Sequence, residues 1–160
     1  MKKLGMMKHK IEVSNEYEVL AKKDEEVSNL LYKNGEYKHA MYFCIQAMEK
    51  YIRSKIFTLV NPNLPYFRER NRNHSLEDAI EFLLEIISTD ENLRNSIRQQ
   101  LFVSILGDVN YQRLHNNLRY PSYSKKFDSY SVSSYTAEDY KFVENGLRKL
   151  KLYLNELNRI

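Results

Sequence analysis

The amino-acid sequence predicts an all-α fold, an up-and-down antiparallel bundle of four to five helices. Apolar residues recur at steps of three and four along most of its 160 residues, which is the period of a helix with one buried face. The chain also has only four glycines and three prolines, so it offers few of the turns that a strand-rich fold needs. A chain of this length suits one hydrophobic core. We therefore predict a basic, flexible tail over residues 1–13 and a single domain over residues 14–160.

Two long helices are expected in the first third of the chain. The first spans residues 14–32 and ends at Asn34-Gly35, a typical helix stop. Its apolar residues fall near one face: Tyr17, Leu20, Val27, Leu30 and Leu31. The second spans residues 36–59 and carries a broader apolar stripe: Ala40, Phe43, Cys44, Ala47, Met48, Tyr51, Ile52 and Ile56. Both helices therefore have a face to bury in a bundle.

The middle of the chain is expected to hold a loop and two further helices. Residues 66–73 are polar and basic, which favours a loop. A capping pair, Ser75 and Asp78, starts a third helix. A fourth helix is predicted over residues 91–118, with Gly107 permitting a bend or a close helix contact.

The last part of the chain is expected to be a loop followed by a helix. Residues 120–135 mix four tyrosines with serines and Lys125-Lys126, and we interpret them as a long, tyrosine-rich loop. Thr136 is a suitable cap for a last helix. The apolar residues of that helix alternate by four and three, a spacing that ordinary bundle packing explains: Val143, Leu147, Leu150, Leu154 and Leu157.

The net charge of +4 is unevenly distributed along the chain. Four lysines stand in the first ten residues without an acid beside them, and the remaining 150 residues carry 21 basic and 21 acidic side chains. Within this balanced part, residues 91–127 hold six basic and two acidic side chains. We therefore expect an anionic partner near residues 91–127 and not at the tail.

Composition excludes several classes of protein. No run approaches the ~20 apolar residues of a membrane span, and the basic N-terminus is not followed by the apolar stretch of a signal peptide. The single cysteine, Cys44, cannot form an internal disulfide or supply a cysteine-rich zinc site, and its place in the apolar stripe indicates core packing. We expect a cytoplasmic protein with no membrane contact, metal or cofactor.

Three short motifs follow one another along the chain. Residues 46–50 read Gln-Ala-Met-Glu-Lys, residues 74–76 read His-Ser-Leu, and residues 118–121 read Leu-Arg-Tyr-Pro. In this order and spacing they resemble the HEPN domain family, which shares Gln-Ala-x-Glu-Lys, a His-x-Leu helix start and an Arg-Tyr-Pro ending. The resemblance extends over roughly residues 14–158. It implies a bundle of four to five helices that forms a homodimer and binds a nucleotide or RNA.

One branch of the family that the chain resembles consists of ribonucleases, often toxins or defence proteins, with an Arg and a His four to six residues apart at the end of the fourth helix. In the matching region Arg113 is in place, but Leu118 or Arg119 stands where the His is expected. His115 follows Arg113 by only two residues, on another face of the helix. RNA cleavage needs a group that gains and loses a proton near neutral pH, which Arg cannot do. The sequence therefore favours phosphate binding over catalysis.

Six residues are candidates for ligand binding: Arg113, Arg119, Tyr120, Glu49, Lys50 and Gln46. Either arginine can grip a phosphate through two parallel hydrogen bonds. Arg119 could equally stack on Tyr120 and pair with an acid of a neighbouring helix. Glu49 and Lys50 could form a polar network with Arg113 or Arg119 across the bundle, although a solvated helix face explains Lys50 as well.

Three functions stay open at this point. The leading hypothesis is a HEPN-like protein that binds a nucleotide or RNA without efficient catalysis, within a toxin–antitoxin or defence system that includes a nucleotidyltransferase partner. The alternatives are a metal-independent ribonuclease that uses Arg113 with His115 or His74, and a purely structural interaction module. His74 otherwise satisfies backbone groups at a helix start. The tyrosine-rich segment with Lys125-Lys126 offers a further route to nucleic acid, since aromatic rings stack on bases.

Overall fold

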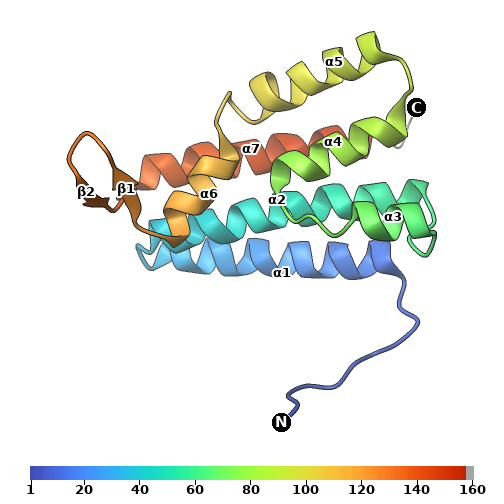
Figure 1. Ribbon diagram of the computed structural model, residues 1–160, viewed down its shortest axis with the longest axis horizontal. Helices are drawn as coiled ribbons and strands as arrows, with labels where there is room; N and C mark the ends of the chain where they lie inside the picture. The colour runs from blue at the N-terminus through green and yellow to red at the C-terminus, as the bar shows by residue number, and fades with distance from the viewer. Residues whose placement is uncertain (158–160) are drawn as a thin grey trace.

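The all-α class is confirmed by the computed structural model, which describes residues 1–157. Its α-helices are α1 (Val13–Lys33), α2 (Tyr37–Leu59), α3 (Pro65–Arg70), α4 (Leu76–Ile87), α5 (Glu91–Gln99), α6 (Tyr111–Arg119) and α7 (Ala137–Glu156). A π-helical segment, η1 (Gln100–Ile105), follows α5, and a short hairpin joins β1 (Ser122–Ser124) to β2 (Ser129–Ser131). The long helices form an up-and-down bundle in which α1 and α2 run antiparallel (Figure 1).

The core of the bundle is centred on α2, which packs against α1, α4, α6 and α7. Of the apolar stripe predicted for α2, all residues but Phe43 are buried, and of the seam predicted for α7, all but Leu157 are buried. Most of the large, fully buried apolar side chains of this core come from α2, α4 and α7, among them Met48, Ile52, Ile56, Phe82, Leu83 and Leu150, and α6 adds Tyr111. No helix in the described part of the chain combines the length and apolar character of a membrane span.

The buried face of α1 matches the predicted one only in part: Tyr17 and Leu31 pack against the core, but the fully buried positions are others. Its buried residues are small and lie seven apart: Ser14, Ala21 and Ser28. The Oγ of Ser14 donates to the carbonyl oxygen of Ser54 at 2.9 Å, and the Oγ of Ser28 donates to that of Ala40 at 2.6 Å. Small side chains at the contact allow the two backbones to approach closely enough for these bonds. Leu20 and Leu30, which we expected in the core, are instead 48% and 62% exposed.

The predicted loop over residues 66–73 contains the short helix α3. Pro65 stands in its first turn, where the missing N–H of proline removes no helical hydrogen bond. The chain then leads to α4, whose predicted cap is confirmed: the Oγ of Ser75 accepts from the backbone N of Asp78 at 3.0 Å.

The single helix predicted over residues 91–118 is interrupted. The chain passes from α5 through η1, turns at Gly107 and Asp108, and starts α6 with Asn110 as its cap. Gly107 has φ +76° and Asp108 has φ +58°, and this left-handed conformation stops a helix. A Cβ at Gly107 would overlap the ring of Phe142 on α7. The positive φ therefore favours glycine here, and the close approach of Phe142 leaves little room for a Cβ.

The predicted loop over residues 120–135 contains the hairpin of β1 and β2, in which Tyr123 lies opposite Tyr130. The hairpin lies at one end of the bundle, next to α6 (Figure 1). Thr136 then caps α7 through a capping box with Asp139.

At the N-terminus, residues 1–12 are exposed and extend away from the bundle (Figure 1). The predicted end of the tail, residue 13, is the first residue of α1.

Candidate functional site

A small cavity lies where the start of α4 and the helix α6 meet α2. Its volume is about 120 Å³. It is lined by one residue of α2, four residues at the start of α4 and five residues of α6: Ile45, His74, Ser75, Leu76, Glu77, Tyr111, Gln112, His115, Asn116 and Arg119. The fold thus brings together three groups that sequence analysis singled out, the two imidazoles and the second arginine.

His115 is a half-buried residue of α6 with two partners on α2. Its ring stacks on Tyr42, with 5.0 Å between the ring centroids, and its Nε2 lies 3.1 Å from the amide nitrogen of Gln46. An amide nitrogen can only donate, so Nε2 of His115 accepts and the proton of the neutral ring is on Nδ1. Burial, and secondly the charge of Arg119, lower the pKa of His115. The ring is therefore neutral at pH 7 and can donate one hydrogen bond from Nδ1.

His74 precedes α4 and is held by a carboxylate of α2. Its Nδ1 lies 3.2 Å from Oε1 of Glu49. Because a carboxylate can only accept, Nδ1 of His74 carries a proton that faces Glu49, and Nε2 is the ring nitrogen left for another partner. The side chain of His74 is 61% exposed, whereas Glu49 is buried. The Gln-Ala-x-Glu-Lys motif thus supports both histidines of the cavity, one through Gln46 and one through Glu49.

The fully buried Arg53 completes this support. Its Nε donates to Oε1 of Glu49 at 2.9 Å, and its Nη1 donates to Oδ1 of Asn71 at 2.8 Å. Its Nη2 donates to the carbonyl oxygen of Asn73 and lies 3.6 Å from Oδ2 of Asp78. A buried charge is tolerated only when it is paired and hydrogen-bonded, which these contacts achieve. Arg53 therefore ties the segment before His74 to α2.

Arg119 is the last residue of α6 and lies one helical turn after His115. Its Nε donates to the carbonyl oxygen of His115 at 3.3 Å, and its Nη2 donates to Oδ1 of Asn116 at 2.8 Å. Its guanidinium also stacks on Tyr120, at 5.1 Å from the ring centroid. Within the described residues, Arg119 forms no ion pair with a carboxylate. Its charge is therefore available to an anion at the cavity.

The other candidates lie outside the cavity. Arg113 is exposed on α6 and is not among the lining residues, and Lys50 pairs with Asp24 of α1. The network that we expected between Glu49-Lys50 and Arg113 or Arg119 is therefore not the one that forms. Glu49 instead bonds to Arg53, which lies one turn later on the same face of α2, and to His74.

Several residues of the site were missed in the sequence, among them Arg53 and Glu77. Arg53 could have been noticed as a charge four residues after Glu49 within an apolar stretch of α2. Glu77 carried no such signal: its Oε1 accepts from the backbone N of Gln112 at 2.6 Å and so joins α4 to the start of α6. Its Oε2 is buried without a hydrogen-bond partner among the described residues.

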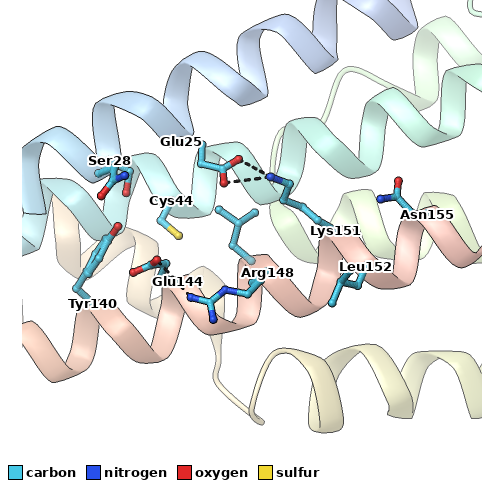
Figure 2. A pocket seen from close by; sticks show the side chains of 11 residues that line it. Glu25, Ser28, Cys44, Tyr140, Glu144, Arg148, Lys151, Leu152 and Asn155 are labelled. Carbon is cyan, nitrogen blue, oxygen red and sulfur yellow. Dashed lines mark hydrogen bonds and ion pairs between the residues drawn. The ribbon is translucent and has the colours of Figure 1, made fainter.

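A larger cavity, of about 280 Å³, lies between α1, α2 and α7 (Figure 2). Its charged side chains are paired with one another: Glu25 with Lys151, and Glu144 with Arg148. Burial raises the pKa of the Cys44 thiol in its wall, so this thiol stays protonated and unreactive. The larger cavity therefore offers neither an unpaired cation for an anionic ligand nor a reactive nucleophile. The described residues include no group of three or more His, Cys, Asp or Glu side chains placed to hold a metal ion.

The fold and the cavity together define the class of protein: a helical-bundle domain with two imidazoles and an unpaired guanidinium at a cavity that can bind an anion. The HEPN domain family matches the chain over residues 19–151. This match covers most of the chain, and the protein therefore belongs to the HEPN domain family. No curated protein and no solved structure matches the chain. Membership indicates a function related to nucleotides or RNA in general.

Proposed function

We propose that the cavity binds a phosphate group of RNA or of a nucleotide, with Arg119 as its anchoring cation. The observation that carries this proposal is the guanidinium of Arg119 at the cavity, without a carboxylate partner among the described residues. A guanidinium bonds to phosphate through two parallel N–H groups. The Nδ1–H of His115 supplies a further donor from the same helix. Arg113 on the same helix and Lys125-Lys126 in the hairpin beside it add positive charge, whereas Arg94 and Arg98 of α5 are already paired with Glu91 and Glu81.

The test is a titration of the purified protein with AMP, ATP and short single-stranded RNAs, with binding measured by calorimetry or fluorescence anisotropy. Arg119→Ala should weaken binding about 10-fold to 150-fold, the range for a lost hydrogen bond to a charged group. Arg113→Ala is the matched control, since it removes the same side chain from an exposed position of the same helix, outside the cavity. Equal losses of affinity in the two variants would indicate that the phosphate binds on the outer face of α6. An unchanged affinity in Arg119→Ala would rule out the proposal.

A second candidate function, metal-independent RNA cleavage, is favoured by the two histidines at one cavity. Nε2 of His74 would take the proton of a 2′-hydroxyl while the oxygen of that group bonds to phosphorus. The resulting imidazolium would give the same proton to the 5′-oxygen as its bond to phosphorus breaks. Arg119 and Nδ1–H of His115 would stabilise the charge that develops on the phosphate oxygens. The products are a 2′,3′-cyclic phosphate and a free 5′-hydroxyl.

Cleavage is tested with an RNA and with the same strand carrying a 2′-deoxynucleotide at the cleaved position. The RNA should be cut and the deoxy strand should not. His74→Gln should abolish cleavage but retain most of the affinity, and His39→Gln, at an exposed position of α2, should change neither. A wild-type protein that binds RNA and leaves it intact would exclude catalysis and leave the binding proposal standing.

A homodimer is the assembly that we propose, because α1 exposes apolar side chains that its own chain does not cover. Val19, Leu20 and Leu30 are 60%, 48% and 62% exposed. Leu20→Glu should convert a dimer to a monomer in light scattering, whereas Lys22→Glu, on the same helix, should not. A wild-type protein with monomer mass would refute the dimer.

A nucleotidyltransferase partner, within a toxin–antitoxin or defence system, also stays a proposal, as does a purely structural interaction module. An adjacent reading frame that encodes a nucleotidyltransferase, and co-purification of the two chains, would support the partner.

A further inference from the structure

We propose that the β1–β2 hairpin is a stacking surface for the bases of single-stranded RNA. This inference rests on the proposed function, because it takes the phosphate at Arg119 as the point from which the strand continues. It deepens that function by naming a strand of RNA, and not a mononucleotide, as the ligand.

The hairpin carries its aromatic side chains on one face. Tyr123 of β1 lies opposite Tyr130 of β2, with 5.6 Å between the ring centroids and 69° between the ring planes. Their neighbours in both strands are serines, which pair with each other: Ser122 with Ser131 and Ser124 with Ser129. Because side chains alternate along a strand, the two rings share one face of the ribbon and the serines share the other.

These rings are exposed, and packing of the bundle does not explain their presence on the surface. Tyr123 is 52% exposed and Tyr130 is 74% exposed, while Tyr120 and Phe127 beside them are 60% and 67% exposed. The hairpin lies next to α6 at one end of the bundle (Figure 1). Its rings do not belong to the hydrophobic core. Large apolar groups that gather on a surface typically mark a binding site.

The hairpin is nevertheless held in place. At its start, the Oγ of Ser122 donates to Oδ1 of Asn117 on α6 at 2.8 Å. After β2, the Nζ of Lys38 on α2 donates to the carbonyl oxygen of Ser133 at 3.4 Å. The hydroxyl of Tyr123 donates to the carboxylate of Asp128 within the turn. A two-stranded ribbon alone is marginally stable, and these bonds hold the hairpin and the Tyr123 ring in place before a ligand arrives, which reduces the entropy lost on binding.

Cations alternate with the rings in a way that matches a nucleic-acid strand. Arg119 stacks on Tyr120 at 5.1 Å, and Lys126 stacks on Phe127 at 5.3 Å. Lys125 adds a further charge in the turn, where the acid Asp128 is already bonded to Tyr123. In single-stranded RNA, phosphates meet cations while the faces of the bases stack on aromatic rings. An apolar protein surface would gain little from these charges, so RNA is the occupant that the charges favour.

The test compares a ten-nucleotide RNA with AMP on the full chain. Tyr130→Ala and Tyr123→Ala should each weaken RNA binding roughly 5-fold to 150-fold, the range for one lost base stack. Binding of AMP should stay within 2-fold of the wild type, because the cavity at Arg119 is intact. Tyr130→Phe should bind RNA as the wild type does, since the ring remains. Tyr66→Ala is the matched control, because this tyrosine is 62% exposed on α3, away from the hairpin.

The possible results separate the two proposals. Unchanged RNA affinity in the Tyr123→Ala/Tyr130→Ala double variant, with loss in Arg119→Ala, would overturn the stacking surface and retain the phosphate site. Loss of RNA binding in the hairpin variants, with no loss in Arg119→Ala, would retain the stacking surface and end the phosphate site. A double variant that binds RNA normally but changes its oligomeric mass would assign the hairpin to a protein contact and overturn the inference. Circular dichroism on each variant excludes unfolding as the cause.

Discussion

Oε1 of Glu49 lies 3.2 Å from Nδ1 of His74, which joins two residues that are 25 positions apart in the sequence. The same oxygen accepts from Nε of Arg53 at 2.9 Å. Glu49 is 5% exposed and the side chain of His74 is 61% exposed, so a buried carboxylate orients a ring that a ligand can reach. The geometry of the candidate site therefore depends on a polar network beneath it, and that dependence can be measured.

Replacing Arg53 by alanine should lower the free energy of unfolding by ~3–5 kcal/mol, because it leaves Glu49 buried without its closest cation. Urea denaturation followed by circular dichroism measures this loss. Arg72→Ala is the matched control: Arg72 pairs with Glu69 at 3.0 Å, but its side chain is 75% exposed, so the loss should stay below ~1 kcal/mol. Equal losses in the two variants would contradict a stabilising role for the buried network.

The pH dependence of stability should reveal His115. Burial, and then Arg119, lower its pKa in the folded chain below the ordinary value of ~6.5. The unfolded chain therefore binds this proton more readily, and the free energy of unfolding should fall as the pH drops through the range below ~6.5 and recover as the pH rises. His115→Gln should flatten this part of the profile, measured as the urea midpoint between about pH 5 and pH 7.5.

His39→Gln, at an exposed position of α2, is the control for the His115 variant. An NMR titration of His115 with a midpoint above ~6.5 would contradict the prediction that burial lowers the pKa of this ring.

The contact between α1 and α2 should not accept a larger side chain. Ala21 is fully buried between Ser14 and Ser28 on the face that packs against α2, so Ala21→Leu should lower the free energy of unfolding by ~1–3 kcal/mol or more. Leu30→Ala, a change of the opposite kind at a position that is 62% exposed, should change it by less than ~0.5 kcal/mol. The periodicity of α1 alone predicts the reverse order. Thermal and urea unfolding of both variants therefore distinguish the two assignments.

The sequence predicted the fold class, the last helix and most of the core of α2 because apolar spacing and capping residues act locally. It was only partly right at α1, where Tyr17 and Leu31 pack against the core but a seam of Ser14, Ala21 and Ser28 is hidden from a search for large apolar residues. It named Gly107 as a place for a bend or a close helix contact but predicted one helix through it, because the approach of Phe142 to Gly107 is a tertiary contact between segments that are far apart in the chain.

For the candidate site, the motifs led to Gln46, Glu49, His74, His115 and Arg119, but not to their partners. The Gln-Ala-x-Glu-Lys motif has no local feature that assigns Gln46 to one histidine and Glu49 to the other. That assignment depends on where α4 and α6 cross α2, which only the folded chain determines. The same crossing separates Arg113 from the cavity and turns Arg119 toward it.

Gly107 should be the least replaceable glycine in the described part of the bundle. Its φ of +76° strains any other residue, and the Cβ of alanine would overlap the ring of Phe142. Gly35 has nearly the same φ, +78°, but open space around it, so Gly35→Ala should cost only the ~1–2 kcal/mol of a left-handed residue. Gly107→Ala should cost more than this in urea denaturation, and a second change, Phe142→Ala, should recover part of the difference by removing the ring. Equal losses of stability for the two glycine variants, or no recovery in the double variant, would contradict this prediction. Either result would show that the contact with Phe142 of α7 is not what requires a glycine at residue 107.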